Sequence, residues 1–250
     1  MTELFQNIVN EPGELIKSLD FTCAPEREHL QDAAKLVKKS ARVFITGIGS
    51  SWHAGMAITA LMARYGTPPT LVDASELLHF TEFPANSVVI ALSRSGKSVE
   101  IVQLLKKARA SKTAIIGVTN TPDSPLAKQA DVTLLMHAAF DRNVSITMYS
   151  ALTLIGGLIA EAAYGKFSDA LRKSLKKSLE ATDKCLPAWT ETIRKSAWCA
   201  AEPAYFLARG SALASCHEAR LLWEEVAKFP ASAMTTGGFR HGPQEILCEG

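Results

Sequence analysis

The sequence lacks any pair of cysteines close enough to chelate a metal ion together. Its cysteines are odd in number and widely spaced, without a Cys-x-x-Cys motif: Cys23, Cys185, Cys199, Cys216 and Cys248. This pattern does not suit a disulfide framework or a zinc site and is typical of reduced thiols in a cytoplasm. His29, His79, His137 and His217 show no ligand-like spacing either. We therefore expect no metal and no other cofactor.

An excess of one charge sign is also missing. The chain has 27 basic and 25 acidic residues spread along its 250 positions, which gives a formal net charge of +2. Without a basic patch, nucleic acid is not an expected partner. The N-terminus has no basic start followed by an apolar run, so we expect no secretory signal and a cytoplasmic location.

Long uninterrupted apolar runs are absent as well. The one candidate membrane span, residues 148–165, is broken by Ser150, Thr153, the Gly156-Gly157 pair and Glu161. A buried helix accounts for this segment equally well, and we expect that structure instead of a membrane contact.

What the sequence does contain is an alternation of short apolar runs and helical patterns. Apolar, β-branched runs recur at 43–48, 70–72, 87–92, 114–118 and 132–136. Helices are predicted at 28–40, 51–65, 98–110, 148–164, 168–184 and 212–228, with a short one at 125–129. This alternation predicts an α/β fold, a parallel sheet with helices on both faces.

Two serine-rich turns follow two of these predicted strands. Gly49-Ser50-Ser51 comes after the first run, and Ser93-Arg94-Ser95-Gly96-Lys97-Ser98 comes after the third. Helix N-termini have unpaired N–H groups and a partial positive charge, and open α/β sheets bind ligands beyond the carboxyl ends of their strands. The two turns therefore predict a pocket for one phosphorylated ligand. Taken one by one, the serines could equally be ordinary helix caps.

The strand-turn-helix pattern restarts near the C-terminus. Residues 204–208 are strand-like, 209–211 form a turn, and 212–228 are helical. We expect an N-terminal extension at 1–27, a first domain at 28–186 and the start of a second, incomplete domain at 187–250, because about 60 residues are too few for a whole doubly wound unit.

Motifs in both halves resemble the sugar isomerase (SIS) domain family, especially the isomerase half of glucosamine-6-phosphate synthase. The resemblance includes the two serine turns, a helix at 217–225 (His-Glu-Ala-Arg-Leu-Leu-Trp-Glu-Glu), and the loop Phe239-Arg240-His241-Gly242-Pro243. It covers roughly residues 30 to 250 and implies two flavodoxin-like SIS domains, each a three-layer sandwich. Four motifs in the same order make a chance match improbable.

The resemblance also implies roles for single residues. Phosphate and sugar contacts would fall on Ser50, Ser51, Ser93, Arg94, Ser95 and Ser98, and on Val144 and Thr147 of the segment 141–147. Glu225 matches the family's general acid/base, and His241 matches the histidine that opens the sugar ring. In the synthase the neighbouring subunit of a dimer contributes that histidine, so we expect a homodimer with a shared active site.

The sequence departs from the synthase in several places. Arg94 and Lys97 stand where the synthase has Gln and Glu, which makes the pocket more positive and suits a more anionic ligand. Leu222 replaces a lysine near the catalytic glutamate. Thr2 stands where the glutaminase half would have its catalytic cysteine, so we expect no glutamine-fed ammonia transfer.

Glu225 and His241 suit the chemistry of aldose–ketose interconversion. One carboxylate must take a proton from a carbon and return it to the neighbouring carbon, and an imidazole titrating near neutral pH suits ring opening. The alternatives are an exposed acid on a charged helix face for Glu225 and a structural capping residue for His241. For His53 we expect packing or capping within its helix, not catalysis.

A nucleotide-binding loop is the main competing motif. Residues 91–98 nearly match Gly-x-x-x-x-Gly-Lys-Ser/Thr, but Ala91 occupies the first glycine position and belongs to the predicted strand. Nucleotide hydrolysis is therefore not expected.

The resulting prediction is a phosphosugar isomerase or deaminase acting on an amino sugar phosphate such as glucosamine 6-phosphate. One alternative is a fructosamine 6-phosphate deglycase, which would use the same residues. Another is a sugar-phosphate sensor without catalysis, although residues 1–40 contain no clear helix-turn-helix. A structural protein would leave the serine turns without a ligand.

Overall fold

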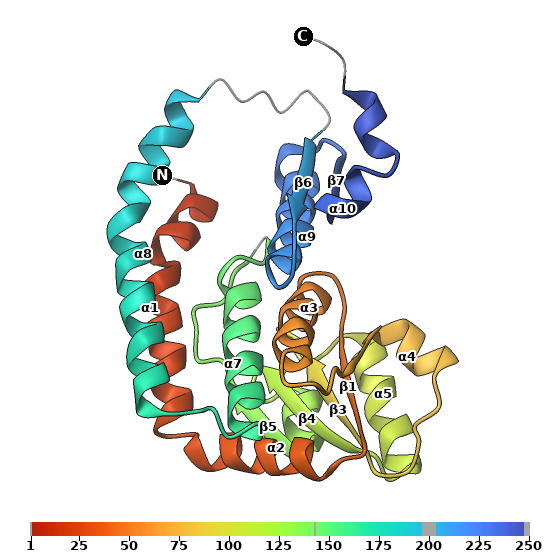
Figure 1. The fold of residues 1–250 in the computed structure, drawn as a ribbon. Coiled ribbons are helices and arrows are strands. Elements are labelled where there is room, and N and C mark those ends of the chain that lie inside the picture. The colour runs from red at the N-terminus through yellow and green to blue at the C-terminus, as the bar shows by residue number, and fades with distance from the viewer. Residues whose placement is uncertain (1, 143, 197–203, 248–250) are drawn as a thin grey trace.

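A five-stranded parallel sheet forms the centre of the molecule in a computed structural model, which describes residues 2–142, 144–196 and 204–247 (Figure 1). The strand order is β2-β1-β3-β4-β5. The strands are β1 (Arg42–Gly47), β2 (Thr70–Asp73), β3 (Ser87–Leu92), β4 (Ala114–Thr119) and β5 (Val132–Leu135). The helices between and around them are α1 (Glu3–Cys23), α2 (Arg27–Lys39), α3 (Ser50–Ala63), α4 (Ala74–Phe80), α5 (Val99–Ala110), α6 (Pro125–Gln129), α7 (Thr147–Ala163) and α8 (Asp169–Lys195).

Helices cover both faces of this sheet, which explains why its strands are apolar on both sides. In β3, Val88, Ile90 and Leu92 belong to the core shared with α1, α2, α3 and α7. Val89 and Ala91 belong to the core shared with α4, α5 and α6. Successive side chains of a strand point to opposite faces, so a strand buried on both faces reads as an unbroken apolar run.

The predicted α/β fold and the five predicted strands are confirmed, and most predicted helices differ from the structure by only one or two residues. The segment at 168–184 was predicted too short, because α8 continues through Pro187 to Lys195. A proline in a helix removes its own N–H and costs stability without always ending the helix. The domain boundary at 186/187 thus falls within a continuous helix and stays a prediction.

Residues assigned to an N-terminal extension form a helix that adds to the core. Leu15, Leu19 and Cys23 of α1 are buried in the same cluster as the sheet and α7. Figure 1 shows α1 and α8 side by side, and Asp20 of α1 makes ion pairs with Arg172 and Lys176 of α8.

The C-terminal segment forms a smaller unit. Strands β6 (Ala204–Ala208) and β7 (Ala231–Thr235) pair in parallel, and α9 (Ala212–Leu222) connects them. The helix predicted at 212–228 ends earlier, because a π-helical turn, Trp223–Ala227, follows α9 and Lys228 adopts a left-handed conformation with φ 62°. The short helix α10 (Thr236–Phe239) and the 3-10 turn Pro243–Ile246 follow.

The apolar segment near residue 150 is the buried helix α7. Its residues Ala151, Leu152, Ile155 and Ile159 are completely buried against the sheet and neighbouring helices. Among the described residues, no helix is both long and apolar enough to span a bilayer.

Candidate functional site

The first serine turn is a tight passage from β1 into α3. Gly49 has φ 56° and occupies the N-cap position, so the helix begins at Ser50 without a side-chain cap. A Cβ at Gly47 would lie 2.8 Å from the backbone carbon of Ser51, which requires glycine there. In the described part of the chain, neither the Ser50 nor the Ser51 hydroxyl caps the helix, so the capping alternative does not apply to them.

The second serine turn connects β3 to α5 and is held by its own hydrogen bonds. The Gly96 N–H donates to Ser93 Oγ (3.1 Å), and the Lys97 N–H donates to Ser95 Oγ (3.2 Å). Gly96 has φ 61°, and a Cβ there would lie 2.3 Å from Ser124 Oγ. Ser98 occupies the N-cap position of α5, but its hydroxyl makes no capping hydrogen bond to the described backbone.

The two turns meet at one edge of the sheet because β1 and β3 are neighbouring parallel strands. Between them lies a cavity of about 460 Å³. Its lining consists of Ile48, Gly49, Ser50, Ser51, Ser93, Arg94, Ser95, Ser98, Glu100, Ser145, Leu221 and Glu225. A site beyond the carboxyl ends of parallel strands is the usual ligand position in such folds.

Arg94 contributes the positive charge of this cavity. Its guanidinium lies 5.0 Å from the centre of the Phe140 ring and donates a hydrogen bond to the Asp141 carbonyl oxygen (3.3 Å). The backbone of Arg94 is fixed too, since its carbonyl oxygen accepts from Thr119 Oγ1 and from the Asn120 N–H. A guanidinium whose position is fixed by neighbouring groups is well suited to bind an anionic ligand.

Glu225 reaches the same cavity from the C-terminal segment, on the π-helical turn after α9. Partial removal of its carboxylate from water raises the pKa of Glu225 above its ordinary value, and the nearby Glu218 raises it further. Arg94 and Lys228 act in the opposite direction. A carboxylate with a raised pKa is better suited to take up and return a proton near neutral pH.

The segment 141–147 closes another side of the cavity, with a different residue from those predicted. The buried Asp141 accepts hydrogen bonds from the N–H groups of Ile146 and Met148, both 2.9 Å, and so anchors the start of α7. Ser145 lines the cavity, whereas Val144 and Thr147 do not belong to its lining. Thr147 is buried in the first turn of α7.

His241 lies outside the cavity of its own chain. It follows α10, is exposed, and donates its N–H to the Gly238 carbonyl oxygen (3.1 Å). The structure therefore brings Glu225 to the serine turns but does not bring His241 there.

His53 does not line the cavity between the serine turns and pairs instead with a residue of α9. Its Nδ1 lies 2.7 Å from Glu218 Oε2, and both side chains are buried. The prediction of packing or capping within α3 missed this partner, which is 165 residues away in sequence.

Comparison with known proteins decides the family. The SIS domain model matches residues 35–159, which is half of the chain and includes both serine turns. The chain belongs to the SIS domain family. Glu225 and His241 lie beyond the matched residues.

Individual relatives of this SIS domain chain are metabolic enzymes by name. A glutamine–fructose-6-phosphate aminotransferase from Pyrobaculum aerophilum is 27% identical over 97% of this chain and 42% of its own length. An arabinose 5-phosphate isomerase from Francisella tularensis is 33% identical over 63% of this chain and 51% of its own. The structure of a glucosamine-6-phosphate deaminase from Thermotoga maritima has a TM-score of 0.83 at 19% identity, covering 100% of this chain and 75% of that one. The chain thus spans about half or less of the two curated relatives.

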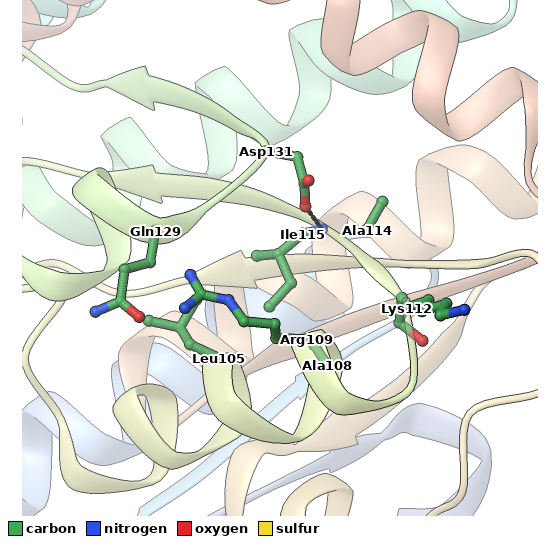
Figure 2. Close-up of a pocket in the computed structure, with 9 residues that line it drawn as sticks. Leu105, Ala108, Arg109, Lys112, Ala114, Ile115, Gln129 and Asp131 are labelled. Atoms are coloured by element: carbon green, nitrogen blue, oxygen red, sulfur yellow. Dashed lines mark hydrogen bonds between the residues drawn. The ribbon is translucent and has the colours of Figure 1, made fainter.

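A second cavity of about 290 Å³ lies at the start of β4, away from the serine turns of the SIS domain (Figure 2). Arg109 and Gln129 lie on one side of Ile115, whose N–H donates to Asp131 Oδ2 at 2.7 Å. None of the predicted site residues lines this cavity.

The competing nucleotide-loop reading fails on the strand itself. Ala91 is buried within β3, so the chain is still extended where a nucleotide loop needs its first glycine. Among the described residues, no group of His, Cys, Asp and Glu side chains could hold a metal ion.

The cavity-lining residues that sequence reasoning missed are Ile48, Glu100, Ser145 and Leu221. Each lies within four residues of a predicted site residue, so proximity to the motifs was the available signal. Leu221, at the end of α9, and Glu225, in the π-helical turn that follows, both line the cavity, because residues about one turn apart lie on the same face.

Proposed function

We propose that this chain binds a phosphosugar in the cavity between the two serine turns and transfers a proton between its first two carbons. The observation that carries the proposal is that one cavity is lined by the serines of both turns, by Arg94 and by Glu225, the acid that the C-terminal segment contributes. Three named relatives that act on sugar phosphates support the same class of ligand.

The phosphate would bind at the N-termini of α3 and α5. Backbone N–H groups and serine hydroxyls there donate hydrogen bonds, and the helix dipoles favour the negative charge. The hydroxyls of Ser50, Ser51 and Ser98 make no capping hydrogen bond within the part of the chain that the structure describes, so they suit this role better than hydroxyls already used as caps.

Glu225 would then act on the open-chain sugar. Its carboxylate takes the proton from C2 of the aldose, the electron pair forms the C1–C2 double bond, and the carbonyl oxygen O1 gains a proton. The protonated Glu225 returns its proton to C1, while the group on C2 loses one and becomes a ketone or, for an amino sugar, an imine. Water hydrolyses the imine to ketose phosphate and ammonia in a deaminase.

We propose an amino sugar phosphate such as glucosamine 6-phosphate as the substrate, with isomerase or deaminase chemistry. A fructosamine 6-phosphate deglycase is the second candidate, and the observation that favours it is Arg94, because its held guanidinium in the cavity suits a ligand with a further anionic group. A phosphosugar sensor would need the cavity but not Glu225.

We also propose that residues 187–250 begin a second SIS domain after the first at 28–186. The parallel β6-α9-β7 unit supports this, because it repeats the strand-helix-strand connection of the first sheet. A homodimer in which His241 reaches the cavity of the other subunit is part of the proposal, and the exposed position of His241 outside its own cavity supports it.

The test is proton NMR in D₂O with glucosamine 6-phosphate and, separately, fructose 6-phosphate. We expect deuterium at C1 or C2 with the unaltered protein and a loss of about 10²- to 10⁴-fold in Glu225→Gln, since general acid–base catalysis contributes about that factor. Glu224→Gln is the matched control, because Glu224 is the adjacent acid, pairs with Arg220 at 2.6 Å and does not line the cavity.

The outcomes separate the candidates. Ammonia release identifies a deaminase, and exchange without release identifies an isomerase. Fructosamine 6-phosphate is supplied in a third sample, and turnover of that compound alone identifies a deglycase. Binding of these sugars without any exchange contradicts the catalytic proposal and favours a sensor. Equal activity of the Glu225→Gln and Glu224→Gln variants would remove Glu225 from the mechanism.

A further inference from the structure

A buried polar pair connects the two parts of the molecule behind the cavity. His53 of α3 and Glu218 of α9 are 4% and 3% exposed, and His53 Nδ1 lies 2.7 Å from Glu218 Oε2. The two side chains are thus joined by a buried hydrogen bond between an imidazole nitrogen and a carboxyl oxygen. Figure 1 shows α9 above α3, with which it is in contact, and beside β6 and β7.

The pair favours one docking position of α9 on α3, because burying a carboxyl group without a partner costs free energy. Glu218 Oε1 has no hydrogen-bond partner among the described residues, which leaves His53 as the one group that offsets burial of this carboxylate there. Removing one member of a buried pair is strongly destabilising, since the other is then left uncompensated. Docking α9 against any other part of α3 would leave both groups unpaired.

Each member of the pair lies close in sequence to a residue that lines the cavity. His53 follows Ser51 by two residues on α3, and Glu218 precedes Glu225 by seven residues, about two helical turns. Leu221 lies between Glu218 and Glu225 in the sequence, and its Cδ2 would be 3.9 Å from a Cβ placed on Gly49. Movement of α9 along α3 would therefore shift Glu225 relative to the first serine turn.

We propose that His53 and Glu218 are positioning residues, whose buried pair holds α9 in register on α3 and so fixes the Glu225 carboxylate above the serine turns. The catalytic consequence rests on the proposed function, whereas the docking of α9 does not. Neighbouring rings support the register: Trp52 and His53 of α3 both contact the His217 ring of α9, with centroids 6.3 and 5.7 Å apart.

Glu218 also acts on Glu225 through space. The groups that influence the Glu225 carboxylate are Glu218, Arg94, Lys228 and Glu224, and the negative charge of Glu218 raises the pKa of Glu225. Glu218→Gln removes that charge, so the Glu225 pKa falls and the carboxylate stays ionised to lower pH. The acidic limb of the kcat profile should therefore move to lower pH, which a purely structural residue would not cause.

The first experiment measures docking without any substrate. Hydrogen exchange of the amides in residues 212–227 is compared in the unaltered protein, His53→Gln, Glu218→Gln and the double variant. We expect amide exchange to be about tenfold faster in His53→Gln than in the unaltered protein, because Glu218 is left buried and unpaired. In the double variant, exchange should be slower than in His53→Gln, because the effects of the two substitutions are coupled. Ser215→Ala is the matched control, since it removes a 3.5 Å contact with Tyr149 from the same helix without removing a buried charge.

The second experiment measures function on the variants that remain folded. We expect Glu218→Gln to lower kcat about tenfold or more while KM for the phosphosugar changes less than about threefold, because a displaced base affects the reaction more than phosphate binding. Ser215→Ala should keep the kcat and pH profile of the unaltered protein.

The two proposals fail in different ways. If the unaltered protein turns over no phosphosugar, the proposed function fails and the exchange of residues 212–227 still decides the docking role. If exchange in His53→Gln and Glu218→Gln equals that in Ser215→Ala, the pair does not position α9. Unchanged kcat and an unmoved acidic limb in Glu218→Gln would likewise overturn its effect on Glu225.

Discussion

The five-stranded sheet and the C-terminal segment differ in how they bury their strands. Every residue of β3 is buried, between two cores formed by helices on either face. No residue of β6 or β7 is buried to that degree, and α9 buries only Ala214 and the polar Glu218 among its described residues. The sheet unit is stabilised by its own apolar core, whereas the position of the C-terminal segment depends largely on the contact between α9 and α3.

This difference assigns different tasks to the two regions. The serine turns follow strands whose last four residues are all buried, so the sheet core holds the backbone of both turns in place. Glu225 comes from the segment with the smaller core, and its place depends on the contact between α9 and α3. Under the proposed function, the sheet unit carries the groups that bind the ligand and the C-terminal segment carries the acid/base, so a change in docking would affect the reaction more than binding.

The largest expected effect is on stability and tests the difference between the two cores. Ile90→Ala on β3, a residue that is 0% exposed, should lower the free energy of unfolding by about 2 to 5 kcal/mol, because it removes buried methyl groups and leaves a cavity. Leu207→Ala on β6, at 37% exposure, should cost less than about 1.5 kcal/mol. Urea denaturation followed by circular dichroism measures both, and equal losses would contradict the comparison.

A smaller effect is expected where α3 and α7 approach most closely in the sheet unit. A Cβ on Gly156 would lie 2.1 Å from Ile58 Cδ1 and 2.8 Å from Ile58 Cγ1, and Ile58 is buried with little room to move. Gly156→Ala should therefore destabilise the protein by about 1 to 3 kcal/mol.

The adjacent glycine is the matched control for that substitution. At Gly157 the nearest atom would be Leu61 Cδ2 at an ordinary 3.9 Å. Gly157→Ala should stabilise the helix by about 0.5 to 1 kcal/mol, because alanine loses less backbone entropy on folding. Thermal unfolding of the two variants checks the sign, and a destabilised Gly157→Ala would mean that α7 is not packed as described.

The strands, both serine turns and the helices around the sheet other than α1 and α4 could be predicted from the sequence, because local patterns determine them. Apolar runs that end in Gly-Ser-Ser or Ser-Arg-Ser signal a strand followed by a helix N-terminus. The position of Ser145 could not be predicted, since it depends on the path of the loop that Asp141 anchors through two backbone N–H groups.

Contacts between segments that are far apart in the sequence could not be predicted from local patterns. His53 reads as a polar residue early in a helix, and Glu218 as one acid in a charged helix, and nothing local indicates that they pair. The role of α1 was missed for the same reason: its Glu14 and Ser18 bond to the backbone of Ala139 and Met136, beside the loop that borders the cavity. Patterns along the chain predict elements, while their mutual docking requires the fold.

The smallest expected effect concerns a buried acid at the junction of α1 and α7. Burial raises the pKa of Glu11, and the nearby Asp141 raises it further, while the hydrogen bond that Ser150 donates at 2.5 Å lowers it. The folded protein therefore binds this proton more tightly than the unfolded chain does, so the contribution to stability is present at low pH and is lost as pH rises through the folded pKa. Glu11→Gln should flatten that loss and raise stability at neutral pH by less than about 1 kcal/mol, because glutamine still accepts from Ser150 without a charge to bury. Urea denaturation between pH 4 and 8 (about the range in which carboxyl groups with raised pKa titrate) measures it, with the exposed Glu28→Gln as the control for charge alone. A stability change that is the same for both variants would mean that this helix is held to the sheet unit by apolar contacts only, which would strengthen the contrast with α9, where a polar pair is the main buried contact.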